Sequence, residues 1–457
     1  MRNTKKWSAT LLLAGILAIT SLCGCGNNTN ENTSTEASHS SVEENNTSAG
    51  NSTSSDTEKV VITMMFSGTT TEHDFETEIL PVLVEEHFPN VKLEVTKLPD
   101  DQYYTALKTK LSSGECPDMI RVQAKYAGAN SVISLAEAGY LEPITNLEAL
   151  KNVSESGKAS YSYNNQVYVI PATVMILGTY YNKDMFEEHN LSIPTNWEEF
   201  LNCCRILKEA GIQPITMGDK DMYVMQFGLY QIAANQVYAN NKNFDDELST
   251  GVTQFTDEGT WDTVLEMYAS LYDNGYIDSN SLGLGVQQAN QMFIDGEAAM
   301  TFNISSQAAA LQAEGAAEFE RGFFPLPGNN EGEELYASMS MGGSPAIYSG
   351  SKNKEICKEI LEWWFDGESE LFQAYATSGR GIVTYGYGSD EINPIFEASM
   401  EIYRDNRTFY WCNQGWPSGV ETEMQALFSE LIGQQGTTID AITSGMQAKY
   451  KELSDTE

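Results

Sequence analysis

The stretch from Tyr168 to Phe200 constrains the fold of this chain most, because it sets two kinds of secondary structure side by side. An apolar run ends at Pro171, and a second run begins at Val174 and ends at the aromatic pair Tyr180–Tyr181. Polar residues follow, and Met185–Glu188 opens a short helical turn. A strand, a turn and a helix in such close succession are typical of an α/β fold.

The helix expected at the end of this stretch has a capping signature. We predict that the Thr195 hydroxyl accepts a hydrogen bond from the backbone N–H of Glu198, whose carboxylate reaches back to Thr195. Leu201, Ile206 and Leu207 follow at helical spacing and would form the apolar face of the helix.

This stretch resembles the family 1 extracellular solute-binding proteins of ABC transporters, most of which bind carbohydrates. The usual family sequence here is a short strand with a proline, then Tyr-Tyr-Asn-Lys-Asp-Met-Phe, then Pro-Thr-Trp-Glu-Glu-Phe. This chain departs from it only by Asn196, between Thr195 and Trp197. The likeness continues through most of the mature chain, in the segments 111–118, 139–145, 271–277, 293–300, 323–328 and 341–347.

The first residues indicate export. Three cations precede an apolar run from Leu11 to Leu22, which is too short to span a bilayer comfortably but suits a signal peptide. The run ends in Leu-Cys-Gly-Cys, which resembles the lipobox of bacterial lipoproteins. The resemblance implies that residues 1–24 are a lipoprotein signal peptide and that Cys25 is lipidated. A cleaved signal followed by an ordinary cysteine is the alternative.

Residues 25–58 hold the lipid-attachment cysteine and a segment of Asn, Ser, Thr, Glu and Gly with Val42 as its one large apolar residue. Such a composition buries too little surface to offset the entropy of ordering, so we predict a flexible tether.

The formal net charge of the chain is -38. This acidity excludes a nucleic-acid partner, which needs a basic surface, and it identifies no ligand by itself.

The segment after the tether alternates strands and helices. Residues 59–66 are apolar on both faces, as in a parallel strand, and a helix, the strand Val91–Val95 and a second helix follow before a strand at Pro117. We expect Asp100 or Asp101 to cap the second helix and Gly114 to end it. This order predicts a doubly wound open sheet, in which ligands bind beyond the carboxyl ends of the strands.

The resemblance implies more than this pattern does. It implies a two-lobed periplasmic-binding-protein-like α/β fold, each lobe an open doubly wound sheet flanked by helices, with a hinge between the lobes. Lobe 1 would comprise residues 59–169 plus 338–384, and lobe 2 residues 172–335 plus 388–457. The C-terminal segment itself predicts two amphipathic helices interrupted at Gly433.

Catalytic and metal-binding patterns are weak in this sequence. It has neither the phosphate-binding loop of an ATPase nor a Gly-x-Ser-x-Gly motif, and its four histidines have no metal spacing. The five cysteines after Cys25 are an odd number, so at least one thiol stays free, and we interpret them as structural. We therefore predict no catalytic residue, metal or cofactor, and no enzyme activity.

A sugar site needs flat aromatic rings for the sugar faces and fixed polar groups for the hydroxyls. Trp416 is the strongest candidate because it lies in a Gly-Trp-Pro loop, where a packing role is less natural than on a helix face. Either Tyr180 or Tyr181 could face the cleft while the other packs beneath it. Arg121 is interpreted as ordinary charged surface. The predicted ligand-binding residues are Phe66, Gln123, Tyr180, Asp219, Asn303, Gly342, Arg380 and Trp416.

Two pairs of neighbouring residues have interpretations other than ligand binding. Gly342 and its neighbour Gly343 either let the backbone approach a ligand or serve the hinge. Trp363 and Trp364 lie within an amphipathic helix, and we expect them in the core.

The resemblance implies a monomeric, lipid-anchored receptor on the extracellular face of the cytoplasmic membrane. It would capture a carbohydrate, and the many aromatic residues favour an oligosaccharide, in an interlobe cleft by hinge closure. It would deliver the sugar to the permease subunits of an ABC importer and contact the ATPase only through them. An anchored glycoside-active enzyme and a sugar-sensing surface receptor are the alternatives. The residues do not select one sugar, chain length or linkage.

Overall fold

The structure is a computed structural model that describes residues 59–68, 74–125, 128–153, 155–308, 310–312, 317–378, 382–383, 394–417 and 419–454. Contacts within the chain group residues 57–457 into one unit. The predicted signal peptide, Cys25, the tether and Arg380 lie outside the described residues. Within the described ranges no helix is both long enough and apolar enough to cross a membrane.

The first sheet has the strand order β11-β3-β1-β2. Strand β1 pairs in parallel with β2 and with β3, and β11 pairs antiparallel with β3. The bounds are β1 Val60–Ser67, β2 Val91–Leu98, β3 Met119–Ile120 and β11 Ala346–Ile347. The chain passes from β1 to β2 through α1 and from β2 to β3 through α2, as predicted.

The two connecting helical segments begin with different residues at the N-cap. A π-helical turn, η1 (Phe75–Ile79), precedes α1 (Leu80–His87), and the Asp74 side chain caps η1. Helix α2 begins at Asp100, so Pro99 occupies the N-cap position and the prediction of an aspartate cap is wrong. Gly114 ends α2 in the left-handed conformation with φ 72°, which confirms the predicted C-cap.

The second sheet is mixed rather than parallel. Its strand order is β13-β10-β6-β8-β7, and β9 and β12 also pair with β6. The partners β8, β9, β10 and β12 run antiparallel to β6, whereas β7–β8 and β10–β13 are parallel pairs. The bounds are β6 Pro171–Asn182, β7 Gln213–Thr216, β8 Ala298–Ile304, β9 Arg321–Phe324, β10 Ala337–Gly343, β12 Ile382–Val383 and β13 Thr408–Tyr410.

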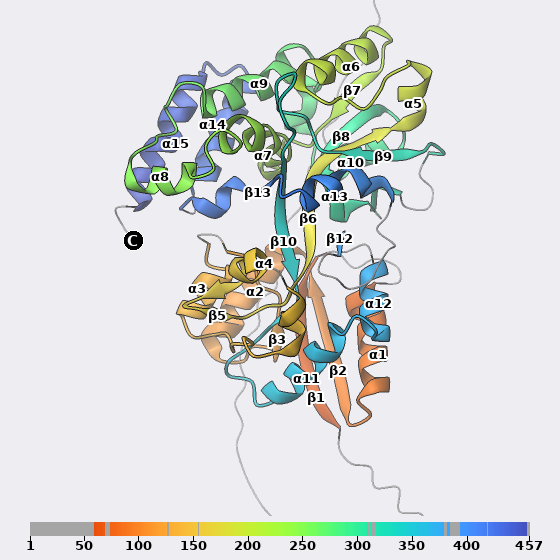
Figure 1. The fold of residues 1–457 in the computed structure, drawn as a ribbon, viewed down its shortest axis with the longest axis vertical. Helices are drawn as coiled ribbons and strands as arrows, with labels where there is room; N and C mark the ends of the chain where they lie inside the picture. The colour runs from red at the N-terminus through yellow and green to blue at the C-terminus, as the bar shows by residue number, and fades with distance from the viewer. Residues whose placement is uncertain are drawn as a thin grey trace, which may run out of the picture. The chain divides into compact units, whose positions relative to one another are not determined.

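Helices cover both sheets (Figure 1). With the first sheet lie α1, α2, α3 (Val132–Glu137), α4 (Glu155–Ser160), α11 (Lys354–Trp364) and α12 (Glu370–Thr377). With the second lie α5 (Lys183–Glu188), α6 (Trp197–Glu209), α7 (Gln226–Ala233), α8 (Phe244–Thr250), α9 (Trp261–Asp273), α10 (Val286–Ile294), α13 (Glu397–Arg404), α14 (Val420–Ile432) and α15 (Ile439–Ser454). The C-terminal pair α14 and α15, separated at Gly433, confirms that prediction.

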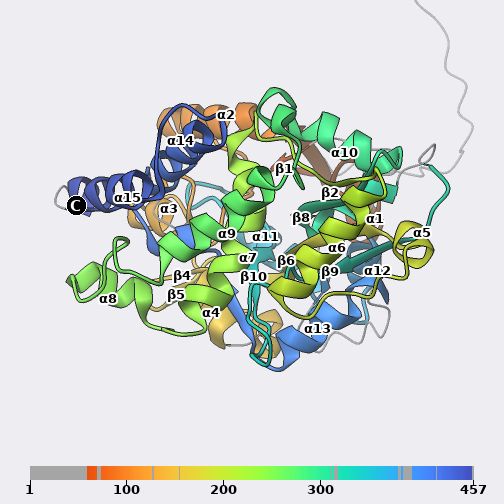
Figure 2. The ribbon, with the colours of Figure 1, turned by 90° about the horizontal axis from the view of Figure 1, so that it is seen from above.

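Strands β6 and β10 connect the two sheets, and seen from above they lie near the centre of the view (Figure 2). At the start of β6, Ala172 packs in the core of the first sheet, whereas Leu177 further along packs in the core of the second. Strand β10 runs back antiparallel to β6, and their pairing shifts register between Gly342 and Gly343. The lobe boundaries predicted from the resemblance remain a prediction, since residues 57–457 form one unit by contact.

The capping box predicted at Thr195 and Glu198 is shifted by one residue. Helix α6 begins at Trp197, and the Asn196 side chain accepts from the backbone N–H of Glu199 at 3.0 Å. The Glu199 carboxylate reaches back to the Thr195 N–H at 2.8 Å and to its hydroxyl at 2.9 Å. The additional residue Asn196 is itself a good N-cap, so it displaces threonine from that position.

Candidate ligand-binding pocket

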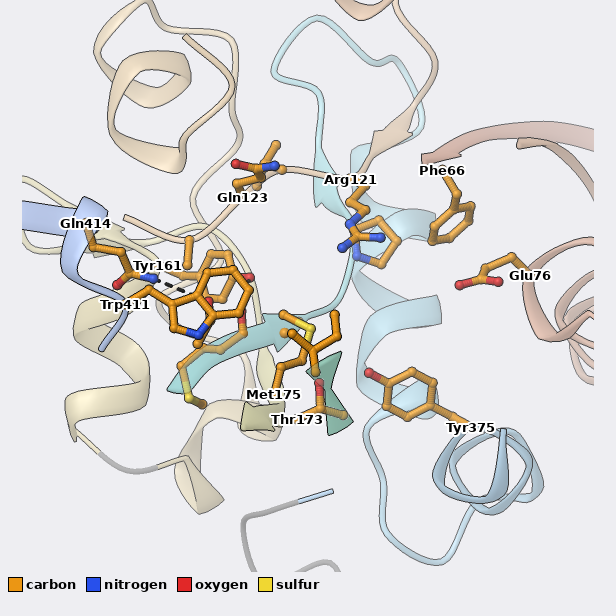
Figure 3. A pocket seen from close by; sticks show the side chains of 18 of the residues that line it. Phe66, Glu76, Arg121, Gln123, Tyr161, Thr173, Met175, Tyr375, Trp411 and Gln414 are labelled. Carbon is orange, nitrogen blue, oxygen red and sulfur yellow. Dashed lines mark hydrogen bonds between the residues drawn. The ribbon is translucent and has the colours of Figure 1, made fainter. Parts of the chain in front are cut away.

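A pocket of about 250 Å³ lies where the ends of β1 and β3 meet the two connecting strands (Figure 3). Phe66 belongs to the end of β1, and residues 121–124 directly follow β3. The carboxyl ends of parallel strands present loop residues at one edge of a sheet. The pocket therefore lies at the edge of the first sheet where the sequence predicted a ligand.

Three groups of residues line the pocket. Figure 3 shows Phe66, Glu76 and Tyr375 on one side and Trp411 and Gln414 on the other. The connecting strands β6 and β10 supply residues between these sides. The first-sheet elements contribute Phe66, Glu76, Arg121, Val122, Gln123, Ala124, Tyr161, Pro345, Trp364 and Tyr375; β6 and β10 contribute Thr173, Met175, Ser340, Met341, Gly342 and Gly343; and the second-sheet elements contribute Ile304, Trp411, Asn413 and Gln414.

Three amide side chains in the lining use their NH₂ groups within the protein. The Gln123 amide donates to the Tyr104 hydroxyl, that of Asn413 to Glu421 Oε2 at 3.0 Å, and that of Gln414 to Ser340 Oγ at 3.3 Å. Within the described part of the chain, their amide oxygens accept no hydrogen bond. These oxygens are available as acceptors.

Two tryptophans in the lining offer unused hydrogen-bond donors rather than acceptors. The indole N–H groups of Trp364 and Trp411 are shielded from solvent and have no acceptor among the described residues. An indole N–H can only donate. A buried polar group without a partner costs free energy, so the pocket favours a molecule that carries both donors and acceptors and has flat apolar faces.

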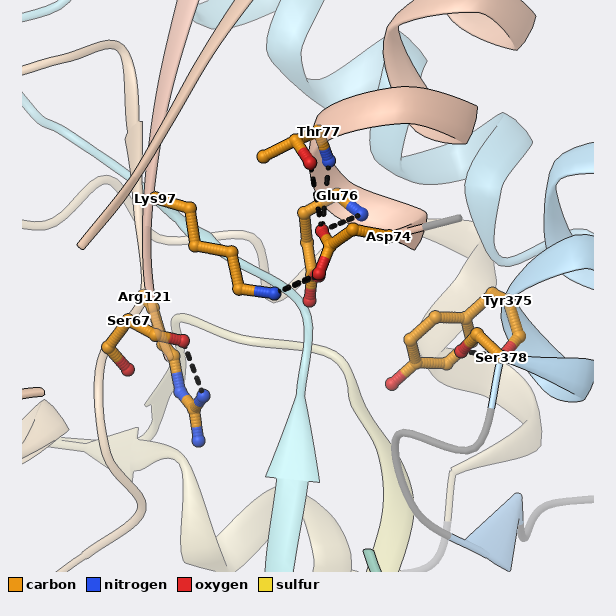
Figure 4. A network of polar contacts seen from close by, with 8 residues as sticks. All are labelled: Ser67, Asp74, Glu76, Thr77, Lys97, Arg121, Tyr375 and Ser378. Carbon is orange, nitrogen blue, oxygen red and sulfur yellow. Dashed lines mark hydrogen bonds and ion pairs between the residues drawn. The ribbon is translucent and has the colours of Figure 1, made fainter. Parts of the chain in front are cut away.

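A buried ionic network supports the Glu76 side of the pocket (Figure 4). The Lys97 ammonium contacts the Asp74 carboxylate and lies 3.2 Å from Glu76 Oε2, and its side chain is 1% exposed. Asp74 Oδ1 in turn accepts from the backbone N–H groups of Glu76 and Thr77, each at 3.1 Å. The network thus fixes the first turn of η1, which places Glu76 at the pocket.

A buried tyrosine ties β10 to the first sheet. The Tyr161 hydroxyl donates to the backbone oxygen of Met341 at 2.9 Å. Burial raises the pKa of Tyr161 well above its ordinary value, so the hydroxyl keeps its proton and remains a donor.

Three of the predicted ligand-binding residues line this pocket: Phe66, Gln123 and Gly342. That they contact a ligand stays a prediction. A Cβ atom at Gly342 would lie 2.4 Å from Thr173 Oγ1, so packing between β10 and β6 requires glycine here. Arg121, which the sequence interpretation assigned to ordinary surface, also lines the pocket, because the chain turns inward after β3.

The structure corrects the placement of Trp416. Its side chain is 1% exposed and packs in the core of the second sheet, with ring centroids 4.9 Å from Trp261 and 5.0 Å from Phe255. Its indole N–H donates to Asp245 Oδ1 at 3.3 Å. This side chain turns inward, and Trp411 on the same loop lines the pocket instead.

Tyr180 and Asn303 also lie outside the pocket. Tyr180 is 0% exposed, and its hydroxyl donates to the backbone oxygens of Ile304 and Ser305. Tyr181 packs against Phe186 and Phe324, so neither tyrosine of the pair lines the pocket. Side chains alternate along a strand, and the next residue after Asn303, Ile304, is the one that reaches the pocket.

Asp219 lies in the core of the second sheet rather than at the pocket. It is 1% exposed, and its Oδ2 accepts from the Tyr272 hydroxyl at 3.0 Å. The short loop after β7 faces inward, against Val286. The last predicted residue, Arg380, lies outside the described residues.

The family model described as bacterial extracellular solute-binding protein matches residues 76–369. A curated relative, the multiple sugar-binding protein of Streptococcus mutans serotype c, is 24% identical over 370 residues, which cover 78% of this chain and 83% of the relative. Lipoprotein LipO of Bacillus subtilis is 24% identical over 321 residues, 65% of this chain and 62% of LipO.

Among solved structures, the solute-binding protein RafE in complex with raffinose superposes with a TM-score of 0.71 at 21% identity. The match covers 86% of this chain and 100% of RafE. This likeness confirms the predicted fold class.

Proposed function

Because this chain belongs to the family of bacterial extracellular solute-binding proteins, we propose that it is the receptor of an ABC importer and captures a carbohydrate, such as an oligosaccharide, in the pocket between its two sheets. It then delivers the sugar to the permease subunits in the membrane. It acts as a monomer and uses no cofactor.

The chemistry of the pocket lining carries this proposal. Aromatic rings of Phe66, Tyr375 and Trp411 lie beside amide oxygens and indole N–H groups that have unused hydrogen-bonding capacity. Sugar rings present apolar C–H faces and a rim of hydroxyls, each of which both donates and accepts. The relatives support the ligand class, since one is named a multiple sugar-binding protein and another was solved with raffinose.

We propose that the two sheets with their helices are the two lobes and that β6 and β10 form the hinge. The lining comes from both sheets, so a bound sugar contacts both and favours their closed arrangement. The register shift at Gly342 and Gly343 supports a hinge there, because an irregular pair of strands bends more easily than a regular ladder.

Attachment through a lipid on Cys25 would hold the receptor at the extracellular face of the cytoplasmic membrane. The name of the relative LipO, a lipoprotein, supports this part of the proposal. An anchored glycosidase fits less well, because such enzymes use two carboxyl groups at a set separation. Among the described residues that line the pocket, Glu76 is the one carboxylate, and it pairs with Lys97.

The test is calorimetry of the mature chain against mono- and oligosaccharides, raffinose included, at constant pH. A sugar that binds the folded state also raises the melting temperature by mass action. We expect Trp411→Ala to weaken binding of the best sugar about fivefold or more, since it removes a stacking face worth about 1–3 kcal/mol. Trp363→Ala is the matched control: this tryptophan is also partly exposed, stacks on His87 outside the pocket, and should leave affinity unchanged.

Three results would contradict parts of the proposal. Failure of every sugar to bind would remove the carbohydrate class. Equal losses of affinity for Trp411→Ala and Trp363→Ala would remove the pocket as the site. Cleavage of a bound sugar, detected by chromatography after the titration, would favour the enzyme alternative.

A further inference from the structure

One loop of the second sheet has a pocket face and a core face. Residues 411–416, called the pocket loop below, follow β13 and include the turn η9 (Cys412–Gly415). Trp411, Asn413 and Gln414 line the pocket, whereas Cys412 and Trp416 are buried on the other side. The position of the pocket residues therefore depends on what holds the loop from the core side.

Asp245 of α8 holds the loop there. Its Oδ1 accepts from the Trp416 indole N–H at 3.3 Å and from the Tyr238 hydroxyl at 2.8 Å. Its Oδ2 lies so close to the loop backbone that a Cβ atom at Gly415 would approach it to 2.5 Å. One carboxylate thus contacts two consecutive residues of the loop.

We propose that Asp245 is a positioning residue for the pocket: through Trp416 and Gly415 its carboxylate holds the pocket loop in the arrangement that binds ligand. The affinity part rests on the proposed function, whereas the positioning part concerns the loop alone.

The surroundings of Asp245 explain why its charge matters to the loop. Among the described residues, the groups that face it are Tyr230 of α7, Tyr238 of η4 (Ala234–Tyr238), Cys412 of the loop and Asp246 of its own helix, and none of them is a cation. Burial raises the pKa of Asp245 to about 6, so at pH 7.5 the group is mainly a carboxylate. A carboxylate accepts charge-assisted hydrogen bonds, which are roughly twice as strong as neutral ones, and an asparagine in its place accepts more weakly.

Asp219 provides a matched control. It is a buried carboxyl in the core of the same sheet, it accepts from a tyrosine hydroxyl, and burial raises its pKa to about 6 as well. Within the described part of the chain, it forms no hydrogen bond with the pocket loop. Asp219→Asn therefore reproduces the loss of a buried titrating carboxyl without touching the loop.

The experiment compares the mature chain with its Asp245→Asn, Asp219→Asn and Gly415→Ala variants at pH 7.5. Hydrogen–deuterium exchange of the peptide that spans residues 408–417 reports the loop without ligand. We expect faster exchange in Asp245→Asn and Gly415→Ala only. Calorimetry with raffinose should give a dissociation constant about fivefold higher in those two variants. Asp219→Asn should bind raffinose as the wild type does.

Unchanged exchange in both loop variants, or an equal change in Asp219→Asn, would overturn the proposal. Gly415 is exposed, so Gly415→Ala keeps the test decisive if Asp245→Asn does not fold. If the wild type does not bind raffinose, the sugar assignment fails, while the exchange result still decides whether Asp245 positions the loop.

Discussion

Asp219→Asn should change how the stability of this protein depends on pH. The Asp219 carboxyl is 1% exposed, with the Tyr272 hydroxyl and the Ser281 side chain beside it. Burial raises its pKa from 3.8 to about 6. The charged form is therefore unfavourable in the folded protein, and folding is penalised wherever the carboxyl is ionised.

The magnitude follows from this pKa. A shift of about two units at 1.36 kcal/mol per unit corresponds to roughly 3 kcal/mol. Between the unfolded pKa of 3.8 and the folded pKa of about 6, the folded state binds more protons than the unfolded state. Stability falls with rising pH in that window and then stays constant. Asparagine does not titrate, so the variant loses this slope.

The assay is urea denaturation of the wild type and Asp219→Asn at half-unit steps from pH 4 to pH 7.5. The difference in unfolding free energy between them should move in favour of the variant by roughly 3 kcal/mol, with most of the change between pH 4 and pH 6. Subtraction cancels the contribution of Asp245 and of other groups common to both proteins. A difference that does not vary with pH would refute the argument that burial disfavours the ionised form of Asp219 in the folded protein.

Two further predictions concern the supports of the pocket. Lys97→Ala removes the ammonium that the buried Asp74 and Glu76 carboxylates share. In urea titrations at pH 7, the free energy of unfolding should therefore fall by about 3–5 kcal/mol. A loss below about 1 kcal/mol would contradict the burial of the network. Gly343→Ala places a Cβ atom 2.5 Å from Val169 Cγ1 and 2.8 Å from the Ile170 oxygen, so it should lower the free energy of unfolding by about 1–3 kcal/mol. The control Gly283→Ala has open space around it and should leave the stability nearly unchanged. Equal effects of the two substitutions would argue against close packing at the register shift.

Local sequence patterns correctly predicted those helices and strands whose limits depend on neighbouring residues. The strand Val60–Ser67, the C-cap at Gly114 and the division of the last two helices at Gly433 depend on residues close in sequence. The mixed directions of the second sheet did not follow from such patterns. They depend on the pairing of β6 with strands from distant parts of the chain, which no local signal encodes.

The pocket lies at the sheet edge that the sequence indicated, and three of the predicted ligand-binding residues line it; that a ligand binds there stays a prediction. Phe66 and Gln123 could be found because they stand at the ends of first-sheet strands. Trp411 and Trp416 share one loop of suitable composition, and the tertiary contacts of Trp416 with Asp245, Trp261 and Phe255 determine which of them turns inward. Whether Asn303 or Ile304 reaches the pocket depends on which face of β8 each side chain occupies. Neighbouring residues of a strand occupy opposite faces, so an error of one residue exchanges them.

The late position of β11 in the chain has a consequence for biogenesis. Ile347 and Ala346 complete the first sheet by pairing with Met119 and Ile120, and nearly all of the second sheet lies between these two segments. The first sheet therefore cannot be completed while only the N-terminal half of the polypeptide has emerged during export. Its edge at β3 stays open until most of the chain is available, and such an exposed edge invites pairing with other chains. Truncated products of this gene should accordingly aggregate rather than accumulate as folded single lobes.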